Sequence, residues 1–300
     1  MLNFLPAPII GAVAAIAIFF NTLFWCLLLY LAAIAKLILP LPAWRRQWTK
    51  AAIWLAEAWI SGNSAWMWLT QRTEWRVHGL DDLRYDEWYL VISNHQSWVD
   101  IFVLQHVFNK RIPFLKFFLK QELIWVPVIG LAWWALDFPF MKRYSREQIE
   151  RHPELRGKDL ETTRKACEKF KTTPVSVMNF LEGTRITPAK HKRQESPYQH
   201  LLKPKAGGIG FVLGAMGDQI DTMLDVTIVY PQDIPDAWNF LRGEVKEVEV
   251  IIKKRPIPAE FLNRDYQNDD AFRDGFQAWV RDLWLEKDML LDQQLATVPE

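Results

Sequence analysis

The apolar and polar positions divide the chain into two parts of different character. Residues 2–35 carry no charged side chain, and the apolar run ends at Lys36. At about 1.5 Å per residue, a helix of this length exceeds the roughly 30 Å hydrocarbon core of a bilayer. The pattern predicts a transmembrane anchor over residues 1–39, formed either by one tilted span or by a helical hairpin that bends near Asn21 and Thr22. The length of the run and the lack of Lys or Arg ahead of it argue against a cleaved secretory signal.

The first charges after the apolar run are all positive. Lys36, Arg45, Arg46 and Lys50 follow one another with no acidic residue between them. Because the cytoplasmic flanks of membrane segments are enriched in Lys and Arg, this asymmetry predicts that the rest of the chain lies on the cytoplasmic side.

Residues 40–72 form a more polar segment, separated from the anchor by Leu39-Pro40-Leu41-Pro42. Its tryptophans mix with charged residues, a composition that suits an interfacial helix or linker in the headgroup layer of a membrane. An equally good interpretation is a helix packed on the following domain, with its tryptophans in the core. The six tryptophans are Trp44, Trp48, Trp54, Trp59, Trp66 and Trp68.

Residues 73–300 show short runs rich in Val, Ile and aromatic side chains that alternate with helical stretches. This alternation is typical of an α/β domain. We expect a catalytic domain here, with a mixed central sheet flanked by helices. The expected strands are Trp75–Val77, Trp88–Ile92, Pro113–Phe117, Phe138–Met141, Val175–Leu181, Val226–Tyr230 and Val245–Ile252. The expected helices are Ser97–Phe108, Gly157–Lys171, Gly207–Gln219 and Asp270–Lys287.

Composition narrows the possible functions. The 300 residues include 36 Lys+Arg against 35 Asp+Glu, so no global positive field marks the chain as a nucleic-acid-binding protein. Two distant cysteines, Cys26 and Cys167, give no sign of a disulfide framework or a zinc site. The 16 tryptophans favour a surface that meets the membrane interface.

Candidate chemistry begins at residues 93–100, Ser-Asn-His-Gln-Ser-Trp-Val-Asp, directly after an expected strand. Strand ends are where α/β folds present reactive groups. If the helix starts at Ser97, His95 lies on the preceding turn and the Asp100 carboxylate reaches back toward the imidazole. Ser97 and Asp100 also match a capping box, in which Asp100 only stabilises the helix start and His95 is an incidental turn residue. The local sequence leaves both interpretations open.

Two sequence blocks resemble those of the glycerolipid acyltransferases, the enzymes that acylate glycerol 3-phosphate or lysophospholipids. Residues 94–100 resemble the N-H-x-S-x-x-D block, and residues 180–185, Phe-Leu-Glu-Gly-Thr-Arg, resemble the F-P-E-G-T-R block. Residues 138–143 are similar to the second block of the family, which closes on an arginine matched here by Arg143. Lys142 stands where the family commonly has an acidic residue.

Weaker similarities complete the pattern. Val226-Thr227-Ile228-Val229-Tyr230 lies where the family has a V-P-V type block, and Lys203-Pro204-Lys205-Ala206-Gly207 is similar to a lysine-and-glycine turn. The resemblance covers about residues 75–230. Residues 119–141 are similar to bacterial inner-membrane YihG-type members of the family and, more distantly, to eukaryotic lysocardiolipin-type acyltransferases.

The resemblance implies a glycerol-3-phosphate acyltransferase-like fold and a reaction. A fatty acyl group would pass from acyl-CoA or acyl carrier protein to the free hydroxyl of a lysophospholipid in the bilayer, with lysophosphatidic acid as the first choice of acceptor. No cofactor or metal is implied, and the location would be the bacterial inner membrane. His95 would act as general base, because an imidazole has a pKa near neutrality. Asp100 would hold its tautomer.

The same resemblance implies a substrate-binding set. Arg143 and Arg185 would hold the acceptor phosphate, since an arginine grips phosphate with two parallel hydrogen bonds. The rest of the expected set is Glu182, Gly183, Thr184 and Lys205. Six Lys or Arg and one Glu between Arg185 and Lys205 add local positive charge, although a solvated basic loop has the same composition.

Other functions stay open at this stage. A membrane-anchored lipid hydrolase would use the same histidine and aspartate with water, and a non-catalytic lipid-binding protein would need neither. No G-x-S-x-G motif is present in the sequence. The apolar residues 123–136 fit either an acyl-chain groove or ordinary core.

Overall fold

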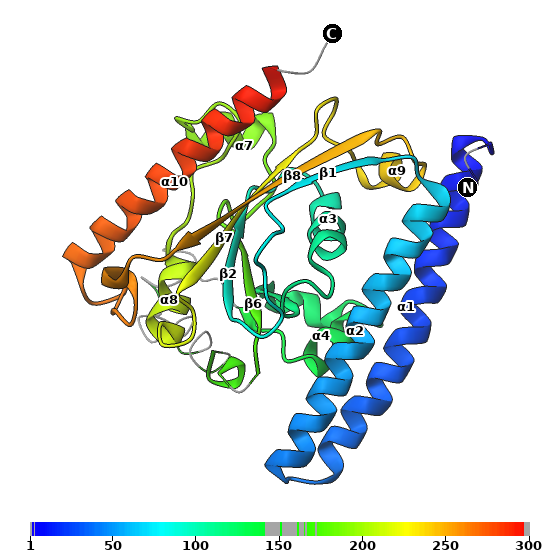
Figure 1. Cartoon of the computed structure of the whole chain (residues 1–300), viewed down its shortest axis with the longest axis horizontal. Coiled ribbons are helices and arrows are strands. Elements are labelled where there is room, and N and C mark those ends of the chain that lie inside the picture. Colours follow the sequence, from blue (N-terminus) through cyan, green and yellow to red (C-terminus); the bar gives the residue numbers. More distant parts are fainter. Residues whose placement is uncertain are drawn as a thin grey trace.

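The structure is a computed structural model that describes Leu2 and residues 4–141, 151, 161, 165, 167–171 and 173–296. Its N-terminal part consists of two long antiparallel helices, α1 (Ala7–Ile38) and α2 (Pro42–Thr70), which lie side by side along one edge of the molecule (Figure 1). We call this pair the helical hairpin. Among the described residues, α1 alone has the length and hydropathy of a membrane span.

The helical hairpin differs from the hairpin considered from the sequence. Helix α1 continues without a break through Asn21 and Thr22, so a bend there is wrong. These polar residues hold the two helices together instead. The Asn21 amide donates hydrogen bonds to the Trp59 carbonyl and to Asn63 Oδ1, both at 2.9 Å, and Trp59 Nε1 donates to Thr22 Oγ1 at 3.1 Å.

The tryptophans of α2 lie in two kinds of environment. Trp66 is buried against the domain core, as expected for a packed helix. Trp54 and Trp68 are exposed on the outer surface, where an interfacial helix would place them. The placement of α2 in a membrane interface stays a prediction.

The remaining residues form the expected α/β domain around a six-stranded mixed sheet. Its order is β1-β8-β7-β2-β6-β3, and every neighbouring pair is parallel except β7 and β8. The strands are β1 (Glu74–His78), β2 (Tyr89–Ser93), β3 (Leu115–Phe117), β6 (Ser176–Phe180), β7 (Thr222–Val229) and β8 (Glu247–Pro256). A small separate sheet pairs β4 (Leu119–Lys120) with β5 (Phe140–Met141).

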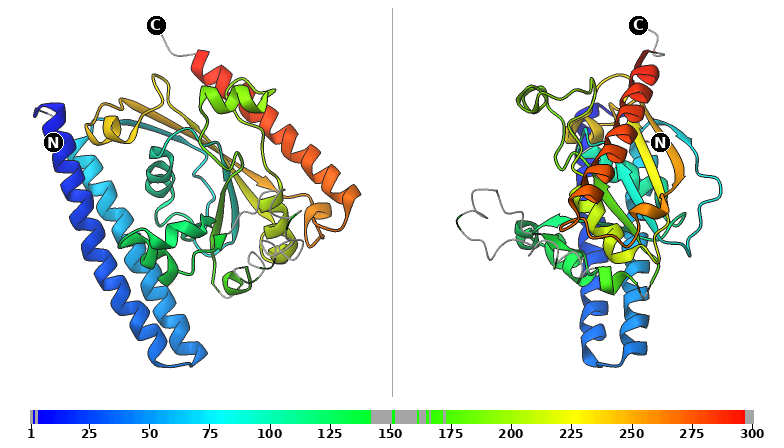
Figure 2. Two further views of the ribbon diagram at one scale, coloured as in Figure 1. Left: turned by 180° about the vertical axis from the view of Figure 1, so that it is seen from behind. Right: turned by 90° about the vertical axis from the view of Figure 1, so that its left-hand side faces the viewer.

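Helices cover both faces of the sheet (Figures 1 and 2). Helix α3 (Val99–Phe108), the short α9 (Ala237–Leu241) and the helical hairpin pack on one face. Helices α8 (Gly207–Met216) and α10 (Asp270–Ala296) pack on the other. Further elements are α4 (Ile129–Ala135), α7 (Pro188–Gln194) and the 3₁₀ turns Gln121–Trp125 and Ala259–Phe261.

The central strands β2 and β6 position the site. Every residue of β2 is buried, which explains why this strand shows a continuous apolar run in the sequence. Strands β2 and β6 are parallel, with Ser93 opposite Phe180. Their carboxyl ends therefore lie at the same edge of the sheet, and the loops that follow them meet there.

Candidate active site

His95 lies on the turn that joins β2 to α3, and Asp100 lies in the first turn of α3. The His95 Nδ1 atom is 2.8 Å from Asp100 Oδ2. Helix α3 begins at Val99 rather than at Ser97, so the chain between the two residues curls back and brings the side chains together. The structure thus forms the pair that the five-residue spacing predicts.

The Asp100 carboxylate is fixed by three donors besides the imidazole. The backbone N–H groups of Gln96 and Ser97 donate to Oδ2 at 2.6 and 2.9 Å. The Tyr230 hydroxyl donates to Oδ1 at 2.7 Å. The bond to Ser97 N–H is one half of a capping box. The capping and catalytic interpretations of Asp100 therefore describe the same carboxylate and do not exclude each other.

The Asp100 carboxylate decides which imidazole nitrogen of His95 carries the proton. An ionised carboxylate only accepts hydrogen bonds, so Nδ1 of His95 must donate to Asp100. The other ring nitrogen, Nε2, is then an acceptor in the neutral imidazole. The His95 ring stacks on Phe180 with a centroid separation of 3.9 Å, which fixes the plane of the ring. Burial and the neighbouring Asp100 carboxylate raise the pKa of Tyr230 well above its ordinary value, so this hydroxyl keeps its proton.

Two polar residues next to His95 have structural roles. Asn94 is buried and bonds in both directions with the backbone of Ile228 in β7, at 2.8 and 2.9 Å. The buried Ser97 hydroxyl donates to the Pro235 carbonyl and accepts from the Val99 N–H. With both functions engaged, Ser97 is not placed to attack a substrate.

Glu182 braces the site from the loop after β6. Its oxygens accept the backbone N–H groups of His95 at 2.7 Å and of Leu202 at 2.9 Å, and its side chain is fully buried. Burial raises the pKa of Glu182 to about 7, against the opposing effect of the two N–H bonds. The expectation that Glu182 binds substrate does not fit this geometry, because no part of the carboxylate is accessible. It positions His95 and the following loop instead.

Gly183 and Thr184 fix the conformation of the loop that leads to Arg185. Gly183 has a φ of +67°, a left-handed conformation that favours glycine. The Lys190 ammonium donates to Thr184 Oγ1 at 2.7 Å and to the Arg185 carbonyl at 2.9 Å. Thr184 therefore stabilises the loop through Lys190.

Arg185 is brought to the histidine turn. The N–H of the next residue, Ile186, donates to the His95 carbonyl at 2.9 Å. The Arg185 guanidinium lies 4.5 Å from the centroid of the Trp98 ring, a cation–π contact that extends the side chain over the turn. The structure therefore places one of the two expected phosphate-binding arginines beside His95.

The structure gives less information on the other two predicted residues, Arg143 and Lys205. Arg143 lies outside the described residues, as does most of the expected helix 157–171. The Lys205 N–H donates to the Leu181 carbonyl at 2.7 Å, but its side chain lines a separate cavity together with Tyr266 and Arg281. Lys205 is thus close in the chain to the site without facing His95.

The apolar residues 123–136 are divided between core and surface. Ala132 and Ala135 of α4 are buried against the helical hairpin, whereas Trp125 and Leu131 are exposed. Ile129, Ala132, Trp133 and Leu136 line an apolar pocket together with Cys26 and Leu29 of α1, so a role in holding an acyl chain stays a prediction.

Three residues with a clear role in this geometry were not expected from the sequence. Tyr230 holds Asp100, Phe180 supports the imidazole and Trp98 carries Arg185. Tyr230 closes the weak V-P-V type block, and Phe180 opens the strong Phe-Leu-Glu-Gly-Thr-Arg block, so both lie in the segments already compared. Their contacts with the His95 turn depend on tertiary structure that local sequence does not show.

Comparison with known proteins agrees with the fold and with the block pattern. Residues 74–230, more than half of the chain, match the family model described as Acyltransferase. The chain therefore belongs to the acyltransferase family. Its particular likeness to bacterial YihG-type members stays a prediction.

Among its relatives are Lysocardiolipin acyltransferase 1 of Danio rerio and 1-acyl-sn-glycerol-3-phosphate acyltransferase 2 of Arabidopsis thaliana. Both are 26% identical, over 228 and 222 residues, and the matches cover 70% and 69% of this chain. The same matches cover 53% and 52% of the relatives, so the chain spans about half their length.

A solved structure shares the fold. The 1-acyl-sn-glycerophosphate (LPA) acyltransferase PlsC from Thermotoga maritima superposes with a TM-score of 0.53 at 16% identity, over 92% of this chain and 97% of that one. This likeness confirms the expected mixed α/β architecture with its flanking helices.

Proposed function

We propose that this protein transfers a fatty acyl group from an acyl thioester to the free hydroxyl of a lysophospholipid, with lysophosphatidic acid as the preferred acceptor. The observation that carries the proposal is the contact of 2.8 Å between His95 Nδ1 and an Asp100 carboxylate that three further donors hold in place. The family supports acyl transfer as the class of reaction.

In this proposal His95 and Asp100 have separate roles. Nε2 of His95 takes the proton from the acceptor hydroxyl as its oxygen attacks the thioester carbonyl carbon. Asp100 stabilises the imidazolium that forms. When the carbon–sulfur bond breaks, the imidazolium returns the proton to the departing thiolate. The sum is an ester and a free thiol, and no group on the protein is consumed.

Arg185 is suited to select the acceptor. A guanidinium binds a phosphate through two parallel hydrogen bonds, and such bonds to a charged group are stronger than neutral ones. Because Arg185 lies over Trp98 on the same turn as the dyad, a phosphate held there would keep the attached glycerol backbone near His95. We expect Arg143 to share this role.

A hydrolase remains the second candidate from the sequence, and the structure argues only against one that forms an acyl-enzyme. Hydrolysis through an acyl-enzyme needs an activated nucleophile, and the Ser97 hydroxyl is buried with both of its hydrogen-bonding functions engaged. Direct attack, by the lipid hydroxyl or by water, needs only the base that His95 provides, so an assay has to separate transfer from hydrolysis.

We also propose that the helical hairpin lies along the membrane surface, on the cytoplasmic side of a bacterial inner membrane, and does not cross it. Two points of α1 contact the catalytic domain. Gly11 lies against Trp238 and Arg242 of α9, and Lys36 pairs with Asp137 at 2.6 Å. These points are about 37 Å apart along the helix, more than the hydrocarbon thickness. A crossing helix would carry part of the domain through the bilayer.

A single assay separates the candidate functions. The purified full chain is supplied with lysophosphatidic acid and other lysophospholipids, and with either acyl-CoA or acyl carrier protein as donor. We expect a diacyl phospholipid, formed fastest from the phosphate monoester acceptor. Acyl release to water in place of transfer would indicate the hydrolase, and binding without turnover would indicate a non-catalytic protein. Protease digestion of the domain from the outer face of right-side-out membranes would contradict the cytoplasmic location.

A further inference from the structure

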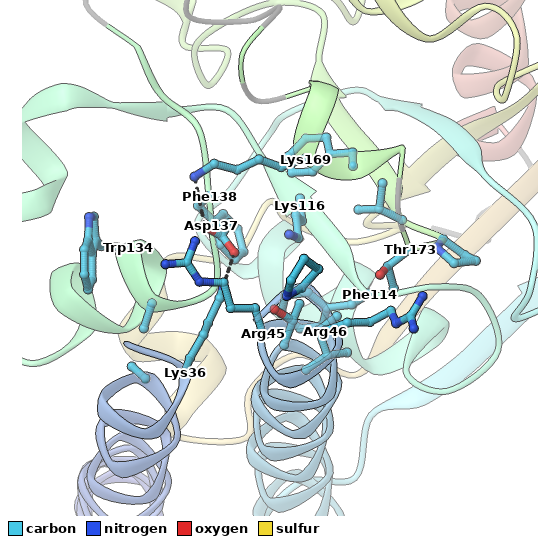
Figure 3. A pocket seen from close by; sticks show the side chains of 18 of the residues that line it. Lys36, Arg45, Arg46, Phe114, Lys116, Trp134, Asp137, Phe138, Lys169 and Thr173 are labelled. Carbon is cyan, nitrogen blue, oxygen red and sulfur yellow. Dashed lines mark hydrogen bonds and ion pairs between the residues drawn. The ribbon is translucent and has the colours of Figure 1, made fainter. Parts of the chain in front are cut away.

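A second site is suggested by a cavity at the end of the sheet opposite to His95. It has a volume of about 650 Å³ and lies between the hairpin end, residues 33–53, and the amino ends of β3 and β6 (Figure 3). Val175 lines this cavity, whereas Phe180 stacks on His95. Val175 directly precedes β6 and Phe180 ends it, so the two residues are separated by about 17 Å of extended chain. The cavity is therefore distinct from the candidate active site.

The cavity is strongly basic. Among the described residues, its lining includes five cationic side chains and a single carboxylate, Asp137. Both oxygens of that carboxylate are already paired, Oδ2 with Lys36 at 2.6 Å and Oδ1 with Lys169 at 3.1 Å. The excess of four positive charges is unusual for a chain whose net charge is only +1. The five cations are Lys36, Arg45, Arg46, Lys116 and Lys169.

Lys116 is the most informative of these residues. It is only 6% exposed, and Figure 3 shows its ammonium group directed into the cavity. Its described contact is a cation–π interaction with the Phe170 ring, 4.6 Å from the centroid, and no ion pair joins it to any described residue. Burial lowers the pKa of Lys116 to about 8, with Lys36 and Lys169 adding to the effect and Asp137 opposing it. A buried, charged and unpaired ammonium is costly unless an anion accompanies it.

Shape and surroundings indicate the kind of anion. Two guanidinium groups and an ammonium are the usual partners of a phosphate. Leu37 and Trp134 line the same cavity and are exposed to 62% and 48%. Leu39 and Leu41, at the turn of the helical hairpin, are exposed as well. A basic cavity beside exposed apolar side chains fits an amphiphile with a phosphate at one end and alkyl chains at the other.

We propose that this cavity binds the phosphate-bearing headgroup of an anionic membrane phospholipid, as a second lipid site separate from the one at His95. The phosphate lies among Lys116, Arg45 and Arg46. The alkyl chains leave past Leu37 and Trp134 toward the membrane. The proposal concerns binding alone and does not require that the protein transfers acyl groups.

The test is a calorimetric titration of the purified full chain in a neutral detergent. The probes are dioctanoyl phosphatidylglycerol, dioctanoyl phosphatidylcholine and inorganic phosphate. We expect the anionic lipid to bind more tightly than either of the others. Inorganic phosphate binding as tightly as the lipid would overturn the assignment to a membrane lipid and indicate a site for a soluble phosphate compound.

Substitutions in and near the cavity test where the anionic lipid binds. Lys116→Met keeps the length of the side chain and removes its charge, and we expect it to weaken binding of the anionic lipid about tenfold or more. Arg46→Gln, at an exposed position where folding is not at risk, should weaken it several-fold. Lys50→Gln is the matched control, because it removes a positive charge from the same helix without touching the cavity; its effect should stay within about twofold.

A last variant separates the two lipid sites. Arg185→Ala removes the expected phosphate contact beside His95 and should leave phosphatidylglycerol binding unchanged. If Arg185→Ala abolishes the binding while Lys116→Met and Arg46→Gln retain it, the titration reports the active site and the second site does not exist.

Discussion

Asp100 shows how one side chain can serve folding and chemistry together. Asparagine at this position has one acceptor oxygen for four donors, so its amide nitrogen would face either the Tyr230 hydroxyl or the three donors that share Oδ2. We therefore expect Asp100→Asn to lower kcat for acyl transfer by roughly 10³-fold to 10⁴-fold and also to lower the melting temperature. His95→Ala is the cleaner comparison, since it should abolish transfer and leave the melting curve nearly unchanged. Retained turnover in His95→Ala would refute the mechanism.

A substitution at Arg185 tests whether this single side chain recognises the acceptor phosphate. A lysine keeps the charge but loses the paired hydrogen bonds and the flat contact with Trp98. We expect Arg185→Lys to raise KM for lysophosphatidic acid about tenfold or more, with a smaller change in kcat. Trp98→Leu should raise KM in the same direction by a lesser amount. An unchanged kcat/KM for Arg185→Lys would show that the guanidinium does not bind the acceptor.

Glu182 makes the stability of the fold depend on pH. Its pKa is about 7 in the folded protein and 4.5 in the reference state for the unfolded chain. Between these values the folded protein keeps a proton that the unfolded chain releases, so the free energy of unfolding falls as pH rises through this window. Glutamine does not titrate. The loss of melting temperature on Glu182→Gln should therefore be greater at pH 5 than at pH 7.5, and equal losses at both would contradict the raised pKa.

At the scale of elements, the helical hairpin depends on a close approach between Gly62 of α2 and Asn21 of α1. A Cβ atom at Gly62 of α2 would lie 2.1 Å from Asn21 Oδ1 of α1. Gly62→Ala must displace the side chain that bonds both Trp59 and Asn63, so we expect a lower melting temperature. Gly275→Ala in α10 is the control, because no atom lies within 4 Å of the position that its methyl group would take; there the better helix propensity of alanine should stabilise the protein slightly. Equal effects from the two would show that the approach is unimportant.

The sequence predicts elements better than it predicts the contacts between them. The buried strand β2 can be located by its continuous apolar run, as expected for a central parallel strand, and apolar residues also mark most of β6 and the second half of β7. The basic composition of segment 188–194 suggests a solvated loop, and this segment is a helix instead. Thr187 followed by Pro188 is a helix start signal, and Thr187 does cap α7.

In the candidate site, too, local features could be predicted from the sequence and long-range contacts could not. His95 and Asp100 are local, five residues apart on one turn, so their pairing could be inferred from spacing and from the family resemblance. The hydroxyl of Tyr230 reaches Asp100 across 130 residues of sequence, and that contact depends on the order of strands in the sheet. The burial of Glu182 likewise depends on the loop at Leu202, which packs over it.

At the scale of the whole molecule, the outer face of α1 is a continuous apolar stripe. We expect Phe20→Ser together with Phe24→Ser to reduce co-sedimentation with phospholipid vesicles about tenfold without loss of fold, because both side chains are more than half exposed. Leu285→Ser with Met289→Ser on α10, equally exposed, is the control and should have no effect. Equal loss from both pairs would point to nonspecific adhesion. The exposed residues of the stripe are Ile9, Ile16, Phe19, Phe20, Leu23, Phe24, Leu27, Leu31, Ile34, Leu37 and Ile38.

The contact between Gly11 and α9 also has a consequence for the synthesis of the protein. Trp238 and Arg242, which meet Gly11 in the folded chain, leave the ribosome more than 200 residues after it. At about 5–20 residues per second this delay is roughly 10 to 45 seconds. During that time the part of α1 around Gly11 lacks its partner α9, and an emerging helix of this hydropathy would aggregate in water. The nascent chain must therefore reach a lipid surface, or a factor that shields it, well before translation ends.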